Sequence, residues 1–215
     1  MELELPKNPW PTHLDAKRIN LTPLGNEHLS QRSEWTADDE LARLMGVDVE
    51  AEPVESQEAE LENNREWLLH RIYSGARVYA IGVEDRYIGD LDLFFMPMER
   101  LAQLTLFIGE RASWGQGYGT EAVERVLEML FTWEPPSRAE REETGQDARA
   151  YEGEFVRPEA VVVDVAPGNE RAVRFWQKLG FVEYDSYETG MRFLRLDRES
   201  YFARPSSDGA AKKDS

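Results

Sequence analysis

The chain has 215 residues, 41% of them hydrophobic and 11% aromatic, so it can bury a sizeable core and does not have the composition of a disordered polymer. Its formal net charge of −17 argues against nucleic acid or an anionic membrane as a partner, because the field of the whole protein repels phosphate. The absence of cysteine excludes disulfides, thiolate metal ligands and a cysteine nucleophile, and three histidines without ligand spacing predict that no metal is bound.

The N-terminal part of the chain predicts one strand followed by helices. Residues 1–15 contain neither a basic region nor an apolar run, so they predict an N-terminal extension and not a signal peptide. Residues 18–23 alternate as a strand does, 26–46 have helical spacing with a break at 36–39, and 58–73 have helical spacing again. No stretch approaches the roughly 18 apolar residues of a membrane helix, so we expect a cytoplasmic protein.

The rest of the chain predicts a sheet interrupted by two helices. Three strand-like runs with short connections favour antiparallel hairpins. They are residues 78–83, 87–95 and 101–109. An amphipathic helix then follows a glycine-rich stretch, and a mostly apolar strand at 160–165 precedes a second helix at 169–179 that Gly180 terminates. Two further strands lie at 181–188 and 191–197.

A charged segment at 133–158 is too long for an ordinary connection and too polar for a core. It is either a flap over a site or an exposed insertion without a role. The last residues, 203–215, form a polar tail that is predicted to be disordered. Between the extension and the tail we expect a single domain at 16–202.

The stretch WGQGYG, residues 114–119, places three glycines directly before an amphipathic helix. A helix leaves its first N–H groups unpaired and partially positive, and glycines let these groups approach an anion without obstruction by side chains. The stretch therefore predicts a phosphate or pyrophosphate site. A P-loop would need a lysine after the glycines, and a dinucleotide fingerprint would need its third glycine at Thr120, so neither pattern is met.

Two motifs in succession resemble one known family. The strand at 101–109 is followed by WGQGYGTEA, and the strand at 160–165 is followed by NERAVRFWQKLGF. This succession is similar to the GCN5-related N-acetyltransferase (GNAT) superfamily. The residue pattern of the first motif resembles that of the branch that acetylates the N-termini of ribosomal proteins. The resemblance covers roughly residues 16–200.

The resemblance implies an α+β (α/β) GNAT fold, in which helices flank a mixed, mostly antiparallel sheet of about seven strands. The sheet would splay between the strands at 101–109 and 160–165, and acetyl-CoA would lie in the splay as co-substrate. The pyrophosphate would bind the backbone amides of Gln116, Gly117, Tyr118, Gly119 and Thr120. The pantetheine arm would pair with the main chain of Leu106, Phe107 and Ile108, helped by Asn169, with Trp176 packed under the cofactor.

Direct transfer from a thioester to an amine needs a base, because an amine of pKa about 10 is mostly protonated at neutral pH. The resemblance implies Asp164 as this base, since relatives carry an acid five residues before the motif asparagine. A carboxylate in the apolar run AVVVDV is costly to bury, which also favours a functional role for Asp164. The alternative is a structural Asp that is hydrogen-bonded to a turn or loop. Other relatives use a Glu on the strand before the glycines, where this chain has Gln103, which cannot act as a base.

Asp90 and Asp92 lie two residues apart and therefore on one face of a predicted strand. We expect them either to bind the ammonium group of the substrate or relay its proton, or to be solvated at the surface. The usual proton donor of the family, a Tyr seven residues after the asparagine, is replaced by Trp176, which cannot supply a proton. The remaining candidates, besides water, are Tyr118, Tyr184 and Tyr187.

The sequence thus predicts an acetyl-CoA-dependent N-acetyltransferase that acts on a primary amine, either a peptide N-terminus or a cationic small molecule such as an aminoglycoside or polyamine. The acidic charge favours a cationic acceptor, although acidic surfaces also serve solubility alone. A non-catalytic CoA-binding module is the alternative, because Gln103 and Trp176 depart from common catalytic patterns. The oligomeric state stays open between a monomer and a homodimer.

Overall fold

A mixed sheet organises the computed structural model, which describes residues 10–50, 56–134 and 156–204. The strands are β1 (Leu14–Asp15), β2 (Asn20–Pro23), β3 (Arg77–Val83), β4 (Arg86–Met96), β5 (Leu101–Ile108), β6 (Ala160–Val165), β7 (Val182–Ser186) and β8 (Arg192–Asp197). Their order in the eight-stranded sheet is β1-β2-β3-β4-β5-β6-β8-β7, and all neighbouring pairs are antiparallel except β5 and β6. The predicted mixed, mostly antiparallel sheet is confirmed, with the two-residue β1 as an unexpected edge strand.

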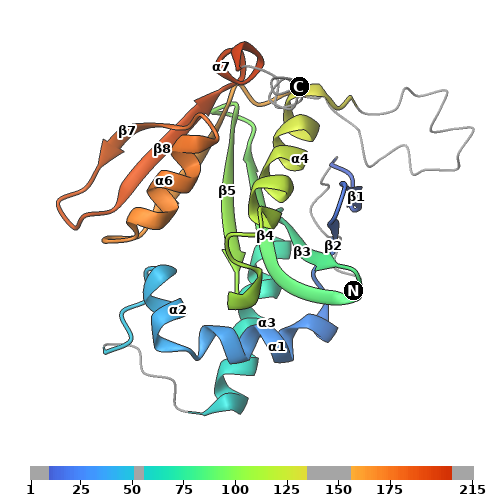
Figure 1. Ribbon diagram of the computed structural model, residues 1–215, viewed down its shortest axis with the longest axis vertical. Helices are drawn as coiled ribbons and strands as arrows, with labels where there is room; N and C mark the ends of the chain where they lie inside the picture. Colours follow the sequence, from blue (N-terminus) through green and yellow to red (C-terminus); the bar gives the residue numbers. More distant parts are fainter. Residues whose placement is uncertain (1–9, 51–55, 135–155, 205–215) are drawn as a thin grey trace, which may run out of the picture.

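Helices cover both faces of the sheet (Figure 1). They are α1 (Asn26–Thr36), α2 (Asp39–Leu44), α3 (Gln57–Tyr73), α4 (Tyr118–Thr132), α6 (Glu170–Lys178) and α7 (Arg198–Ala203), with a short 3-10 turn, η1 (Arg111–Ser113). On one face α1 and α3 bury Leu29 and Leu68 against Val78 and Ala80 of β3. On the other face α4 and α6 cover the centre and the C-terminal end of the sheet.

Side-chain caps and one glycine set the helix boundaries. Asp38 accepts two backbone N–H groups of the first turn of α2, which confirms the predicted break at 36–39. Ser56 accepts the N–H of Ala59 at the start of α3. Gly180 follows α6 with a φ of 88°, the left-handed conformation that ends a helix, as predicted. The helices at 58–73 and 169–179 therefore lie where the pattern placed them.

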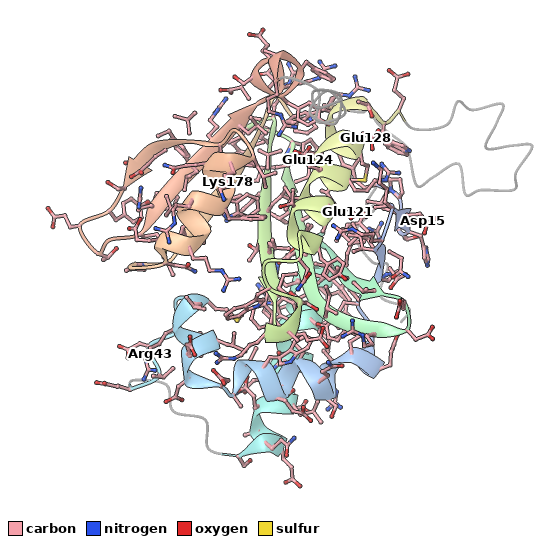
Figure 2. All side chains as sticks on the ribbon, viewed as in Figure 1. Asp15, Arg43, Glu121, Glu124, Glu128 and Lys178 are labelled. Atoms are coloured by element: carbon pink, nitrogen blue, oxygen red, sulfur yellow. The ribbon has the colours of Figure 1, made fainter. Side chains whose placement is uncertain are left out.

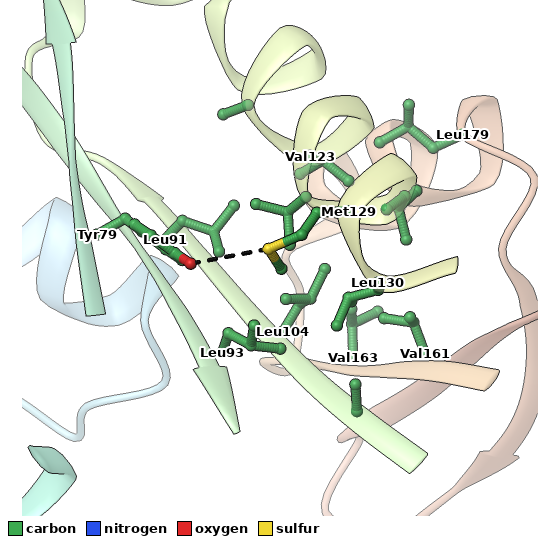
Figure 3. Close-up of a cluster of buried hydrophobic side chains, with 14 of the residues drawn as sticks. Tyr79, Leu91, Leu93, Leu104, Val123, Met129, Leu130, Val161, Val163 and Leu179 are labelled. Carbon is green, nitrogen blue, oxygen red and sulfur yellow. Dashed lines mark hydrogen bonds between the residues drawn. The ribbon is translucent and has the colours of Figure 1, made fainter. Parts of the chain in front are cut away.

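The main core lies between α4 and the sheet (Figure 3). Val123 and Leu130 of α4 pack over Leu91, Leu104 and Val163, and each of these five side chains is at most 1% exposed. Full burial of side chains of this size contributes about 1.5–3 kcal/mol each. Because Leu104 belongs to β5 and Val163 to β6, α4 holds both strands from the same side.

Residues 10–15 belong to this domain, which corrects the predicted extension at 1–15. Trp10 and Leu14 are 2% and 3% exposed in the main core. The hydroxyl of Tyr79 donates a hydrogen bond of 2.6 Å to a carbonyl of the same segment. A segment this short and irregular carries no periodic pattern, so its burial could not be read from the sequence.

Several predicted segments lie largely outside the described residues. Residues 135–155 of the charged segment at 133–158 are not described, nor are residues 1–9 or 205–215. Within the described ranges, no helix combines the length and the apolar character needed to cross a membrane.

The strands β5 and β6 pair over only three residues and then separate. Their parallel register joins residues 101–103 to residues 160–162. Beyond that point β5 pairs with β4 alone and β6 pairs with β8 alone. The β7–β8 hairpin accordingly leans away from β5 in Figure 1. The predicted splay of the sheet between these two strands is confirmed.

Candidate active site

The glycine-rich stretch forms the loop that starts α4 beside the gap between β5 and β6. Gly115 and Gly117 have φ values of 75° and 84°, which other residues adopt only with strain. At Gly119 the requirement for glycine comes from the limited space around the residue. A Cβ atom there would lie 3.1 Å from the side chain of Leu106 on β5 and 3.8 Å from Phe175 on α6. The first turn of α4 therefore lies close to both sides of the gap.

No side chain caps the first turn of α4 in the described structure. The helix has 15 residues, so the N–H groups of Tyr118, Gly119 and Thr120 stand at the partially positive end of a full dipole. Bare N–H groups at a helix start are suited to binding a phosphate. Three of the five predicted pyrophosphate contacts thus lie in the first turn of an uncapped helix, directly after the N-cap residue Gly117, and this arrangement suits a pyrophosphate.

Arg18 holds the loop from the side of α4 that faces β1 and β2. Its backbone N–H and Nε donate to the carboxylate of Glu121 at 2.6 and 2.9 Å, and its Nη1 donates to the carbonyl of Gln116 at 2.9 Å. Glu121 lies on the same side of α4 as Asp15, away from Lys178 of α6 (Figure 2). No sequence pattern indicates this role, because Arg18 and Glu121 are 103 positions apart.

Trp114 ties the loop to both sides of the gap. Its indole Nε1 donates a hydrogen bond of 2.7 Å to the carbonyl of Ile108 at the end of β5. The guanidinium groups of Arg171 and Arg111 lie 4.0 and 5.5 Å from its ring centre, within the range of cation–π attraction. Since Arg171 belongs to α6, this stack bridges the gap. Ile108, predicted to pair with pantetheine, therefore has a carbonyl that already accepts one hydrogen bond.

The helix α2 spans the open end of the gap. Arg111 donates to Asp38 at 2.7 Å, and Asn169 donates through Nδ2 to the carbonyl of Leu44 at 3.0 Å. The Oδ1 of Asn169 accepts the backbone N–H of Ala172 and so caps α6. Both polar ends of the Asn169 side chain are therefore engaged, and its contact with the cofactor stays a prediction.

Asp164 lies close to the point where β5 and β6 separate. Alternation along β6 places Val163 in the core beneath α4 and Asp164 on the opposite face of the sheet. The Nε2 of Gln103 donates a hydrogen bond of 2.7 Å to its Oδ2, so its partner is a side chain of β5 and not a turn. Although Asp164 is exposed, desolvation by the surrounding strands raises its pKa, and the hydrogen bond from Gln103 opposes this rise.

The three candidate tyrosines lie in different places. Tyr118 is at the start of α4, and Tyr187 packs on Phe193 with ring centres 4.8 Å apart. The pKa of Tyr184 is raised, first by desolvation and then by the negative charge of Asp164. Tyr184 therefore shares the electrostatic environment of the predicted base.

Asp90 and Asp92 are buried and paired, which corrects the expectation for both. They are only 3% and 6% exposed, so neither is solvated at the surface. The Nε of Arg32 on α1 donates to Asp90 at 3.0 Å, and the Nη2 of Arg71 on α3 donates to Asp92 at 3.0 Å. Neither carboxylate is free to receive a substrate ammonium group, because an arginine already neutralises it. These pairs fasten α1 and α3 to the sheet.

Trp176 is part of the main core. It is 4% exposed, and its ring centre lies 5.0 Å from those of Phe175 and Phe181. It lies on the buried side of α6 together with Val173, and its indole cannot act as an acid. Contact between Trp176 and the cofactor stays a prediction.

Known proteins share this fold at low sequence identity. A protein of T. thermophilus described as an acetyltransferase is 21% identical with a TM-score of 0.64, covering 90% of this chain and 93% of its own. Spermidine N-acetyltransferase from Vibrio cholerae, solved with CoA and spermine, is 18% identical with a TM-score of 0.61, covering 86% and 98%. RimL, a ribosomal L7/L12 alpha-N-protein acetyltransferase, is 13% identical with a TM-score of 0.58, covering 86% and 93%.

No curated protein matches the chain in sequence. The family model of the acetyltransferase (GNAT) domain, however, matches residues 18–182, which is most of the chain. The same segment contains the splayed strands, the glycine-rich start of α4 and the helix α6. The chain therefore belongs to the GNAT family of N-acetyltransferases.

Proposed function

We propose that the chain transfers the acetyl group of acetyl-CoA to the primary amine of a cationic acceptor. The acceptor is either a peptide N-terminus or a small molecule of the polyamine or aminoglycoside class. Acetyl-CoA, when bound, supplies an activated acetyl thioester. The observation that carries the proposal is the gap between β5 and β6, because it has the uncapped start of α4 beside its open end and the carboxylate of Asp164 near its closed end.

The residues along the gap have complementary roles in this proposal. The N–H groups of Tyr118, Gly119 and Thr120 hold the pyrophosphate. The main chain of Leu106 and Phe107, which pairs with β4 on one side only, offers hydrogen bonds to the pantetheine amides. Direct transfer needs no enzyme nucleophile, in agreement with the absence of cysteine.

Asp164 acts as the general base. An ammonium group cannot attack a thioester until it loses a proton, and a carboxylate within reach of the amine, directly or through one water, can accept it. Its raised pKa brings the carboxyl closer to the pH at which the enzyme operates, which improves a base as long as it stays ionised.

Two observations support a cationic acceptor. The net charge of −17 attracts cations to the whole molecule. Among structural neighbours, one is a spermidine N-acetyltransferase solved with spermine, and another is a ribosomal protein alpha-N-acetyltransferase. Both acceptor types therefore belong in a first screen.

The screen uses the fact that the chain has no cysteine. A thiol-reactive dye then reports the release of CoA without a background from the protein. We expect release with at least one of spermidine, kanamycin and a short basic peptide with a free N-terminus. The matched control is the same peptide with its N-terminus blocked. Neither peptide contains lysine, so the control has no primary amine and should release no CoA. Binding of acetyl-CoA without release for any amine would support the non-catalytic module instead.

A further inference from the structure

The side chains of Gln103 and Asp164 meet where the backbone pairing of β5 and β6 ends. Gln103 is the last residue of β5 in register with β6, opposite Val162. Its Nε2 reaches past Val162 to the Oδ2 of Asp164 at 2.7 Å. A side-chain hydrogen bond thus joins the two strands at the point where their main-chain bonds stop.

We propose that Gln103 is a positioning residue for Asp164. The side-chain amide of Gln103 occupies Oδ2 of Asp164 and leaves Oδ1 as the oxygen that accepts the proton of the substrate amine. This inference rests on the proposed function and adds a residue to its machinery. An amide is suited to the task because it donates a hydrogen bond without titrating and without repelling the carboxylate. No other hydrogen bond to the Asp164 side chain occurs among the described residues.

The neighbouring strands place few charges at Asp164. From β8, Phe193 lies opposite Asp164, and Arg195 on the same face pairs with Asp197 at 2.7 Å. Arg192, opposite Val165, pairs with acids at Glu183 and Glu170. From β7, Tyr184 is the titratable group that responds to the charge of Asp164. Gln103 is therefore the group that offsets the desolvation of the carboxylate.

The pKa of Asp164 should therefore depend on Gln103. A hydrogen bond to the ionised form of a carboxyl lowers its pKa, whereas desolvation raises it. Removal of the amide leaves desolvation unopposed, so Asp164 should take up its proton at higher pH. A glutamate at position 103 would place a second carboxylate beside the first, and two adjacent carboxylates tend to share one proton.

The test compares Gln103→Leu and Gln103→Glu with Thr105→Val, a polar-to-apolar control on the same face of β5. The carboxylate carbon resonance of Asp164, identified by its absence in Asp164→Asn, is followed against pH in the full ligand-free chain. We expect Asp164 to titrate at higher pH in Gln103→Leu than in wild type, at higher pH still in Gln103→Glu, and as in wild type in Thr105→Val. This readout does not depend on turnover.

The pH profile of turnover provides the second readout. On the acidic side, kcat/KM should fall about ten-fold in Gln103→Leu, the effect of shifting the profile by about one pH unit. At the alkaline plateau it should stay within about three-fold of wild type, because Asp164 is then ionised in both. Circular dichroism and acetyl-CoA binding establish that each variant is folded, and Gln103→Glu, which preserves side-chain size, decides the matter if Gln103→Leu does not fold.

Two results would overturn the proposal. One is an Asp164 that titrates at the same pH in wild type and in the folded Gln103 variants. The other is a uniform loss of kcat/KM at every pH, which indicates a structural role for Gln103. If wild type releases no CoA with any amine, the proposed function fails separately, while the resonance of Asp164 still shows whether Gln103 controls its protonation.

Discussion

At the residue scale, two opposing effects act on the pKa of Asp164. Desolvation between the strands raises its pKa, and the hydrogen bond from Gln103 lowers it, with a raised value as the net result. A carboxylate on an otherwise apolar strand was visible in the sequence as AVVVDV. Its partner was not, because only the register of β5 against β6 brings positions 103 and 164 together.

Asp164→Asn directly tests the proposed role of Asp164 as general base. The amide keeps the shape of the side chain and can still accept the hydrogen bond from Gln103, but it cannot take a proton. We expect kcat to fall by about ten-fold or more, with little change in the affinity for acetyl-CoA, because general base catalysis typically contributes about 10²–10⁴-fold. Asp185→Asn, an exposed acid on β7, is the control and should retain kcat.

The same variant has a predicted signature in stability. Because the pKa of Asp164 is raised in the folded state, that state binds more protons than the unfolded chain between the two pKa values, so stability falls as pH rises. At neutral pH, Asp164→Asn should therefore melt at a higher temperature than wild type. The difference should disappear below the unfolded pKa of about 3.9, and a variant less stable than wild type at neutral pH would contradict this assignment.

At the scale of elements, α2 closes the open end of the gap from two directions. Arg111 holds its start through Asp38, and Asn169 holds its end through the carbonyl of Leu44. The sequence predicted a separate short helix here and predicted Asn169 as a helix start, but neither pattern indicates that the two touch. The contact joins residues 125 positions apart.

Two substitutions separate the roles of Asn169. Asn169→Ala removes both the cap of α6 and the bond to α2, whereas Asn169→Asp keeps an oxygen for the N–H of Ala172 and loses the donor to Leu44. Loss of an N-cap costs about 1 kcal/mol, so only the alanine variant should destabilise α6 noticeably. In hydrogen exchange, we expect α2 to exchange faster in both variants and α6 to exchange faster in Asn169→Ala alone. Equal protection of α2 in all three proteins would show that the bond to Leu44 does not hold this helix.

At the scale of the whole molecule, sequence pattern predicted most elements and missed their long-range contacts. The strand at 160–165 has the predicted bounds, and the glycine stretch starts a helix as expected. The burial of Trp10 and the pairing of Asp90 and Asp92 with arginines were not predicted. Periodicity reports the face of an element, whereas these contacts depend on which elements become neighbours.

The net charge of −17 should act with opposite sign on acetyl-CoA and on the proposed cationic acceptor. Acetyl-CoA is an anion and a polyamine is a cation, so the field of the protein slows the first and attracts the second. Salt screens such fields over a Debye length of about 8 Å at physiological ionic strength. In stopped-flow experiments, the association rate of acetyl-CoA should rise with salt and that of spermidine should fall. Rates that change in the same direction would show that the whole-molecule charge does not steer the substrates.

The most direct test of the central claim is a calorimetric titration of acetyl-CoA into wild type, Gly119→Glu and Thr132→Glu. The first variant brings bulk and negative charge to the start of α4, close to Leu106, and the second adds the same charge to an exposed position at the far end of the same helix. Melting of the ligand-free proteins establishes that both variants fold. We expect acetyl-CoA to bind wild type and Thr132→Glu with similar affinity and Gly119→Glu at least about ten-fold more weakly, the effect of losing about 1.4 kcal/mol. Equal binding by all three folded proteins would contradict the assignment of the glycine-rich helix start as the CoA site.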